Sequence, residues 1–97
     1  MYIIFLSYKA SVEKINGELG NHKKFLDGQF SLGNIHASGS LVPRIGGIML
    51  SKMKNKDELE KVLQNDPFNK NNLADYDIIE FMPTRTCKEL EFLIHDN

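Results

Sequence analysis

Residues 2–8 read YIIFLSY, and this segment is apolar on both of its alternate faces. Aromatic and β-branched side chains dominate it, and such side chains favour an extended backbone. A strand that is apolar on both faces is typical of the centre of a sheet, where other layers cover each side. The apolar run is too short for a membrane-spanning helix, and no basic residue precedes it as in a secretory signal. The sequence therefore predicts a central first strand.

The segment after this strand, residues 11–32, has the spacing of a helix. Its apolar stripe consists of Val12, Ile15, Leu19, Leu26 and Phe30. Ser11 is a suitable N-cap, and Gly33 is a suitable stop. Gly17 and Gly20 lower the helical propensity of the middle. We therefore expect one long helix with a break near Gly20.

Two extended segments follow the helix. Residues 35–42 alternate apolar and polar side chains, and residues 48–53 resume an extended pattern. Between them lies the sequence PRIGG at residues 43–47, whose proline and glycines are typical of a turn. This order predicts two antiparallel strands that are joined by a hairpin.

The second half of the chain repeats the change from helix to strand. A short amphipathic helix is expected to begin at Asn55 or Asp57, and Pro83 is expected to end the last strand. The expected elements are a helix over 56–64, a polar loop over 66–72, a strand over 76–82 and a short helical segment within the tail, 84–97.

The order strand, helix, strand, strand, helix, strand is that of the split β-α-β, or ferredoxin-like, motif. It predicts a single α+β domain over residues 1–97, with a core at 1–83 and a tail at 84–97. Right-handed crossovers place both helices on one face of a four-stranded antiparallel sheet. The other face is apolar as well, so we expect two copies to pack sheet to sheet as a homodimer.

The charge balance argues against several classes of partner. The chain has 12 basic and 13 acidic residues and a net charge of -1, which gives no basic surface for nucleic acid or an anionic membrane. The single cysteine, Cys87, cannot form an intramolecular disulfide, and a secreted domain of this size normally contains several. We therefore expect a protein of the cytoplasm that binds neither nucleic acid nor membrane.

His22 falls in the apolar stripe of the first predicted helix, where an imidazole faces the core rather than solvent. A buried histidine needs a hydrogen-bond partner. The best candidate is Asp66, because Pro67 fixes an extended backbone before it and directs the carboxylate. Asp66 would hold the proton of one ring nitrogen and leave the other as an acid or base near neutral pH. The alternative is a purely structural hydrogen bond between the helix and the loop.

Four segments resemble the YciI-related (YCII) family of the dimeric α/β-barrel superfamily. They are HKKFLDG from His22, NIHASGSLVPRIGGIML from Asn34, DPF from Asp66 and YDIIEFMP from Tyr76. The resemblance covers residues 1–83 and implies a ferredoxin-like domain that forms a dimeric α/β barrel. It also implies that His22 and Asp66 are the active-site pair. Most members have no assigned reaction, so the resemblance implies a site more than an activity.

Ser38 and Arg44 are the candidate substrate-binding residues. Ser38, with Ser7 or Tyr8 at the end of the first strand, is placed to line the pocket, and the guanidinium of Arg44 suits a carboxylate or phosphate. The alternatives are ordinary strand serines and a hairpin arginine. The histidines lack the spacing of a metal site, so no metal is expected. They are His22, His36 and His95.

These observations give two hypotheses of different classes. The first is a small enzyme without a cofactor, in which His22 and Asp66 move a proton on a compact polar or aromatic substrate. Its reaction would be that of a lyase, an isomerase or a dehalogenating enzyme. The second is a non-catalytic module that dimerises through its sheet and holds a small ligand. The sequence names no substrate, and the fold alone does not separate the two hypotheses.

Overall fold

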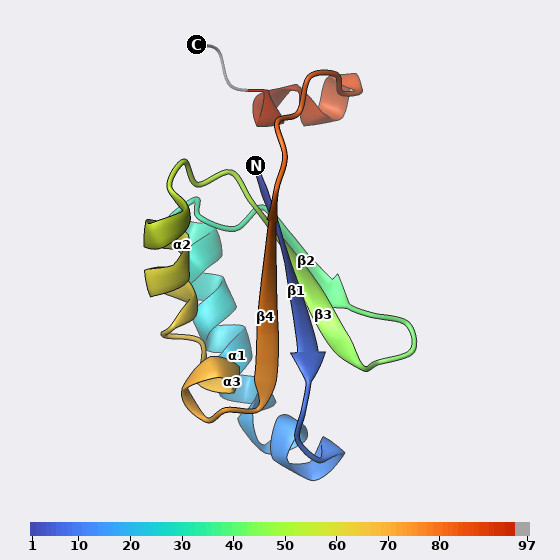
Figure 1. The fold of residues 1–97 in the computed structure, drawn as a ribbon, viewed down its shortest axis with the longest axis vertical. Coiled ribbons are helices and arrows are strands. Elements are labelled where there is room, and N and C mark those ends of the chain that lie inside the picture. The colour runs from blue at the N-terminus through green and yellow to red at the C-terminus, as the bar shows by residue number, and fades with distance from the viewer. Residues whose placement is uncertain (95–97) are drawn as a thin grey trace.

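Strand β1 lies at the centre of a four-stranded antiparallel sheet in the computed structural model, which describes residues 1–94 (Figure 1). The strand order is β2-β3-β1-β4, and the helices lie on one side of the sheet. The predicted α+β, ferredoxin-like fold is therefore confirmed. The elements are β1 (Tyr2–Tyr8), α1 (Val12–Ser31), β2 (Ala37–Ser40), β3 (Gly46–Ser51), α2 (Lys56–Leu63), α3 (Pro67–Lys70), β4 (Ala74–Glu80) and the 3-10 helix η1 (Lys88–Leu93).

Helix α1 begins and ends at the residues that the sequence marks. Ser11 Oγ accepts a hydrogen bond from the backbone N–H of Lys14 at 3.3 Å. Gly33 adopts a φ of +75°, the left-handed conformation that follows many helices. The expected break near Gly20 is wrong, because α1 is continuous over its 20 residues. Packing of its apolar side offsets the roughly 1 kcal/mol that each internal glycine costs.

Helices α2 and α3 start at side-chain caps on the same side of the sheet. Asn55 Oδ1 accepts hydrogen bonds from two backbone N–H groups in the first turn of α2. Asp66 caps α3, and Pro67 occupies its first turn. The prediction of a polar loop over 66–72 is wrong, because an Asp-Pro pair also starts a helix.

Three strands differ in extent from the prediction. Strand β2 is shorter than residues 35–42, and β4 both begins and ends two residues before the predicted range, 76–82. Strand β3 includes Gly46 and Gly47, which pair with Ser7 and Leu6 of β1. The two glycines predicted as turn residues are therefore strand residues.

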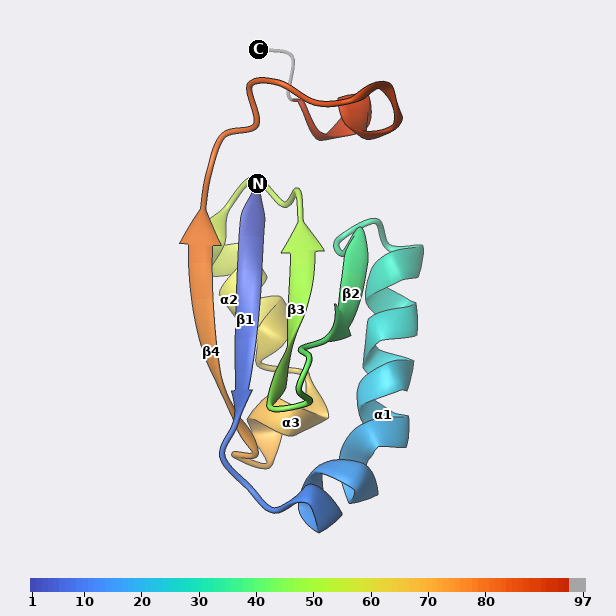
Figure 2. The same ribbon diagram turned by 90° about the vertical axis from the view of Figure 1, so that its right-hand side faces the viewer.

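Alternation along the strands separates two faces of the sheet. Tyr2, Ile4 and Leu6 of β1 are buried on the face that carries the helices. The strand register places a second apolar set on the opposite face, where Figure 2 shows no helix among the described residues. We call this surface the open face, and its apolar residues are Ile3, Phe5, Ile48, Leu50 and Ile79.

The segment after β4 crosses the end of the sheet toward β2 (Figure 2). Its helix η1 buries Leu93, and Lys52 Nζ donates a hydrogen bond to the carbonyl oxygen of Phe92 at 2.7 Å. The ring of His36 packs edge-on against Phe92 at 5.8 Å. Burial, and then the charge of Lys52, lower the pKa of His36 below its ordinary 6.5. The helical segment expected in the tail is therefore a 3-10 helix held by the strand ends.

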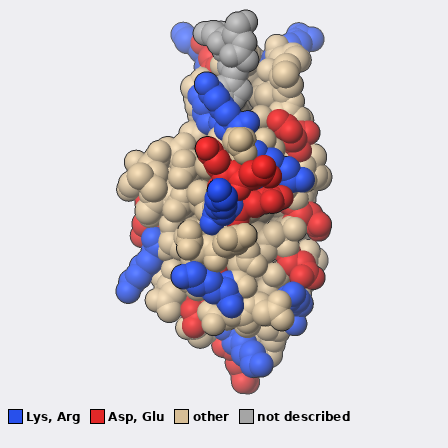
Figure 3. All heavy atoms as spheres, turned by 60° about the vertical axis from the view of Figure 1, so that its left-hand side comes forward, with Lys and Arg blue, Asp and Glu red and all other residues tan. Residues whose placement is uncertain are grey.

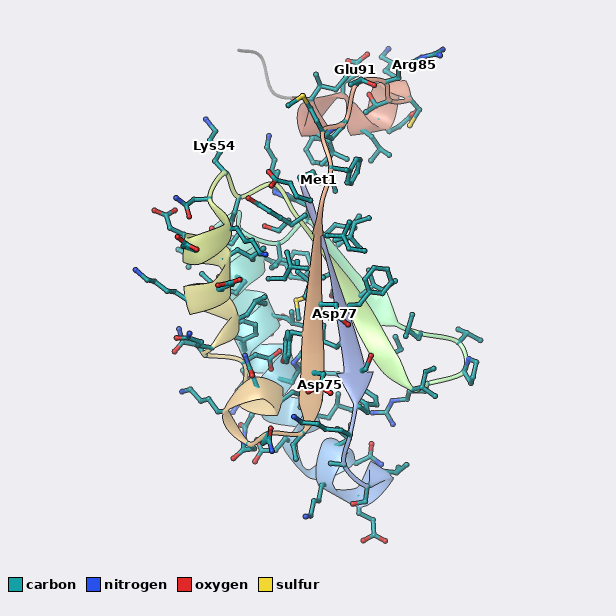
Figure 4. All side chains as sticks on the ribbon, in the orientation of Figure 1. Met1, Lys54, Asp75, Asp77, Arg85 and Glu91 are labelled. Atoms are coloured by element: carbon teal, nitrogen blue, oxygen red, sulfur yellow. The ribbon has the colours of Figure 1, made fainter. Side chains whose placement is uncertain are left out.

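Charged side chains of both signs are scattered among uncharged ones on the surface that Figure 3 shows. On the helix side, acidic and basic residues are intermixed in the view of Figure 3. Asp75 and Asp77 are exposed on β4 (Figure 4), and Lys9 pairs with Asp75 at 2.9 Å. No helix in residues 1–94 is long and apolar enough to span a bilayer.

Candidate active site

Asp66 is the centre of a buried hydrogen-bond network. Its side chain is 0% exposed. Oδ1 lies 2.7 Å from Nδ1 of His22 and accepts a hydrogen bond from the backbone N–H of Phe68 at 3.1 Å. Oδ2 accepts a hydrogen bond from the hydroxyl of Tyr76 at 2.5 Å. The network joins α1 to the consecutive elements α3 and β4, so a helix that is distant in sequence meets them at one carboxylate.

The network assigns the proton of the His22 ring. Phe68 N–H and the Tyr76 hydroxyl both donate to the carboxylate, which therefore acts as an acceptor toward His22 as well. Nδ1 is accordingly assigned the proton, and the lone pair of the neutral ring lies on Nε2. Within residues 1–94, Nε2 has no hydrogen-bond partner and is not one of the fully buried polar atoms. Nε2 is thus the free acid-base position.

Aromatic packing holds the imidazole in place. The ring of His22 stacks on Phe68 with 4.1 Å between centroids and 10° between planes. Phe68 is fully buried and in turn meets Tyr8 edge-on at 5.7 Å. The His22 side chain is 12% exposed, so one edge of a fixed ring reaches the surface. Such pre-organisation favours proton transfer, because the ring needs no reorientation.

Tyr76 is a member of the network that sequence analysis missed. Burial, and then the neighbouring Asp66 carboxylate, raise the pKa of Tyr76 well above its ordinary 10.0, so the hydroxyl keeps its proton and donates. One signal was present in the sequence, since a tyrosine on the core side of a strand needs a partner for its hydroxyl. The predicted range of the last strand began at this residue and gave it no role.

A cavity of about 240 Å³ adjoins His22 between α1 and the sheet. This volume is below the roughly 300–1,000 Å³ of common small-molecule sites, so it suits a compact ligand. Asp66 is not part of its wall. The lining is Leu6, Tyr8, Leu19, His22, Lys23, Leu26, Ser38, Gly39, Ser40, Gly47, Ile48 and Met49.

The sequence was compared with models of known protein families. Residues 1–82 match the sequence model of the YCII-related domain. The chain belongs to the YCII-related family. The resemblance inferred from the four sequence segments is thereby confirmed. No curated protein sequence matches the chain.

Solved structures share the fold of this YCII-related protein, and one of them is an enzyme with a bound ligand. It is 5-chloro-2-hydroxyhydroquinone dehydrochlorinase from Burkholderia phenoliruptrix AC1100, in complex with 2,5-dihydroxybenzoquinone. The two chains are 16% identical, with a TM-score of 0.72 over 82% of this chain and 91% of the dehydrochlorinase. At this level of identity, the similarity shows a common fold.

Of the two predicted substrate-binding residues, one lines the cavity beside His22 and the other does not. Ser38 lies on β2 and lines the cavity beside His22. Tyr8, at the end of β1, lines the same cavity. Arg44 lies in the loop between β2 and β3, outside this cavity, and its Nη1 donates a hydrogen bond to Asn16 at 2.9 Å. Its guanidinium lies 5.9 Å from the centre of the Tyr8 ring. Binding of substrate by Ser38 and Arg44 stays a prediction.

The histidines of the YCII-related chain are not gathered into a metal site within the described residues. No three His, Cys, Asp or Glu side chains of residues 1–94 lie together in an arrangement suited to a metal ion. His36 precedes β2 and contacts the tail rather than the cavity. His95 lies outside the described residues.

Proposed function

We propose that this YCII-related protein is an enzyme that needs no cofactor and transfers a proton to or from a compact polar or aromatic substrate. His22 Nε2 is the acid-base atom, and Asp66 holds Nδ1–H. The observation that carries the proposal is an imidazole fixed by a buried carboxylate, on a residue that lines a small cavity, with its other nitrogen unpartnered within residues 1–94. Positioned histidines of this kind accelerate proton transfer by about 10²–10⁴-fold.

The reaction class follows from a single base beside an apolar cavity. Nε2 removes a proton from a carbon next to a carbonyl carbon, the C–H electron pair forms a C=C double bond, and the carbonyl π pair moves onto oxygen as an enolate. Departure of a neighbouring leaving group completes a lyase or dehalogenating step, whereas return of the proton at another carbon completes an isomerisation. The fold neighbour is named as a dehydrochlorinase, which supports the elimination chemistry. Ser38 is proposed to hydrogen-bond the substrate from β2.

Deuterium exchange tests the acid-base role of His22. Carbon-bound hydrogens of small ketones and halogenated hydroquinones are followed by NMR in heavy water, with the wild type, His22→Gln and His36→Gln. We expect exchange or elimination in the wild type to fall at least about 100-fold in His22→Gln. His36→Gln is the matched control and should keep the wild-type rate, because His36 does not line the cavity. Ligand binding without turnover in the wild type would instead support the non-catalytic module.

We also propose that two copies pair through the open face. Its apolar side chains include Ile79, which is 50% exposed in the single chain, beside the partly buried Ile3, Phe5, Ile48 and Leu50. An apolar sheet face of this kind is typical of an interface between identical subunits.

Sedimentation velocity tests the pairing of the open face. Ile79→Glu places a charge at its β4 edge and should halve the mass of the wild-type particle, because a buried charge without a partner is costly. Val42→Glu is the control, since Val42 is 97% exposed in the loop between β2 and β3. A wild type with the mass of one chain would refute the dimer.

The cellular setting stays a prediction from the cysteine. Cys87 is exposed and free. An exposed thiol is most stable in a reducing compartment, so we propose a cytoplasmic protein.

A further inference from the structure

The cavity beside His22 carries a lysine and, in the part of the chain that the structure describes, no acidic residue in its wall. Lys23 is the lysine. No carboxylate of residues 1–94 lies within 4.0 Å of its Nζ, whereas Lys9 and Lys56 do have such partners. The remaining polar side chains of the wall are a tyrosine and two serines, which can donate a hydrogen bond, and His22, whose Nε2 can accept one.

Helical geometry brings Lys23 to the same wall as His22. Leu19, His22, Lys23 and Leu26 are spaced by three and four residues along α1, and side chains with this spacing share one side of a helix. All four line the cavity, whereas the next residue, Lys24, does not. Lys23 is an exposed residue of this wall, so its positive charge lies where the cavity meets solvent.

Lys23 is exposed, but an anion bound inside the cavity would lie beside apolar side chains, which strengthens its attraction to the lysine. Leucines from α1 and β1 and a methionine from β3 form the apolar part of the wall. Charges interact more strongly beside apolar groups than in bulk water, because the effective dielectric constant is lower. Asp66 does not neutralise Lys23 by contact, since it is fully buried and absent from the wall.

We propose that Lys23 binds an anionic group of the substrate, and that the substrates are compact organic monoanions: carboxylates, phenolates or enolates with an apolar body. The inference rests on the proposed function for the location of the site. The apolar wall holds the body of the molecule, Lys23 holds its charge, and His22 Nε2 lies on the same side of α1. Lys23 thus selects the substrate, and His22 performs the proton transfer.

Matched probes test the selection of anions. Benzoate and benzamide have nearly the same shape and differ in charge, and their binding to the wild type is measured by NMR titration of backbone amides. We expect benzoate to bind about 10-fold more tightly than benzamide, and the difference to shrink as salt is added. Lys23→Met should lower the affinity for benzoate about 10-fold and leave that for benzamide unchanged. Lys23→Arg should keep the wild-type affinity for benzoate, and so should Lys24→Met.

The outcomes separate this inference from the proposed function. An equal affinity for the two probes in the wild type, or an unchanged preference in Lys23→Met, would overturn the anion site. Absence of benzoate shifts around the cavity would overturn it as well. Deuterium exchange that depends on His22 could still be present in either case, and the enzyme would then stand without the anion site. Loss of the benzoate preference in Lys23→Met, with no exchange in the wild type, would support the anion site and refute the enzyme.

Discussion

Asp66→Ala is expected to lower the free energy of unfolding by about 3–5 kcal/mol. The substitution leaves three donors without an acceptor: His22 Nδ1–H, the Phe68 backbone N–H and the Tyr76 hydroxyl. The carboxylate they share is fully buried, so water cannot replace it without entering the core. A domain of 97 residues has about 5–15 kcal/mol of stability in total, and this loss is a large part of it. Urea denaturation followed by circular dichroism measures the change.

A second helix cap provides the control for Asp66. Asn55 accepts hydrogen bonds from two backbone N–H groups, whereas Asp66 accepts one, but Asn55 is exposed and receives no side-chain donor from residues 1–94. Asn55→Ala should therefore cost only about 1 kcal/mol, the ordinary value of an N-cap. If Asp66→Ala costs no more than Asn55→Ala, Asp66 acts as a cap alone and the network does not hold the site together.

Asp66→Asn separates the charge of the carboxylate from its shape. An amide keeps one acceptor oxygen and replaces the other by an NH₂ group, which cannot accept a hydrogen bond. Oδ1 accepts two of the three donors and Oδ2 accepts one, so one or two donors then face the NH₂ group, and we expect a loss of stability smaller than that of Asp66→Ala. A neutral amide oxygen is a weaker acceptor than the carboxylate, and an NH₂ group in the place of Oδ1 would donate to Nδ1, so NMR of the ring nitrogens should show a mixture of Nδ1–H and Nε2–H forms. A single Nδ1–H form in this variant would contradict the assigned role of the carboxylate.

Local signals in the sequence predicted most of the fold. Residues 2–8 form β1 as expected, and α1 lies within one residue of the predicted range because its cap and its stop are encoded next to it. The Asp-Pro pair at residues 66–67 carried an equally local signal for α3, and reading it only as a loop was an error of interpretation. Sequence order then limited the sheet to one ferredoxin-like topology.

Contacts between distant residues were harder to predict. The stripe of α1 placed His22 toward the core, and the structure brings it to Asp66, which is 44 positions away. The role of Tyr76 depended on the register of β4, and nothing local in the sequence specifies a register to within two residues. Arg44 was grouped with the site by its chemistry, but the loop that carries it directs it toward Asn16 on α1. In these three cases the residue type indicated what each side chain can do chemically. Which residues it contacts depends on long-range pairing of the elements.

Gly46→Ala is expected to cost about 3 kcal/mol of stability, because β1 and β3 approach too closely at this position for a side chain. A Cβ atom on Gly46 would lie 1.8 Å from the carbonyl oxygen of Leu6 and 2.9 Å from its carbonyl carbon. Both are backbone atoms of the central strand, so no flexible side chain can move aside. The two strands must separate locally, and Leu6 also lines the cavity beside His22. Urea denaturation gives the loss, and the amide resonances of β1 report where the sheet opens.

Substitutions at two other glycines distinguish the cost of a steric clash from the cost of an unfavourable backbone conformation. Gly39 lies on the edge strand β2, and a Cβ atom there would meet no atom of a non-adjacent residue within 4 Å, so Gly39→Ala should stay within about 0.5 kcal/mol of the wild type. Gly33 also has open space but a φ of +75°, so Gly33→Ala should lose about 1–2 kcal/mol through its backbone alone. The loss at Gly46 should exceed both, since φ there is not positive and the whole effect comes from the Leu6 carbonyl. A Gly46→Ala protein as stable as Gly39→Ala would mean that β1 and β3 lie farther apart than described, and the wall of the cavity with them.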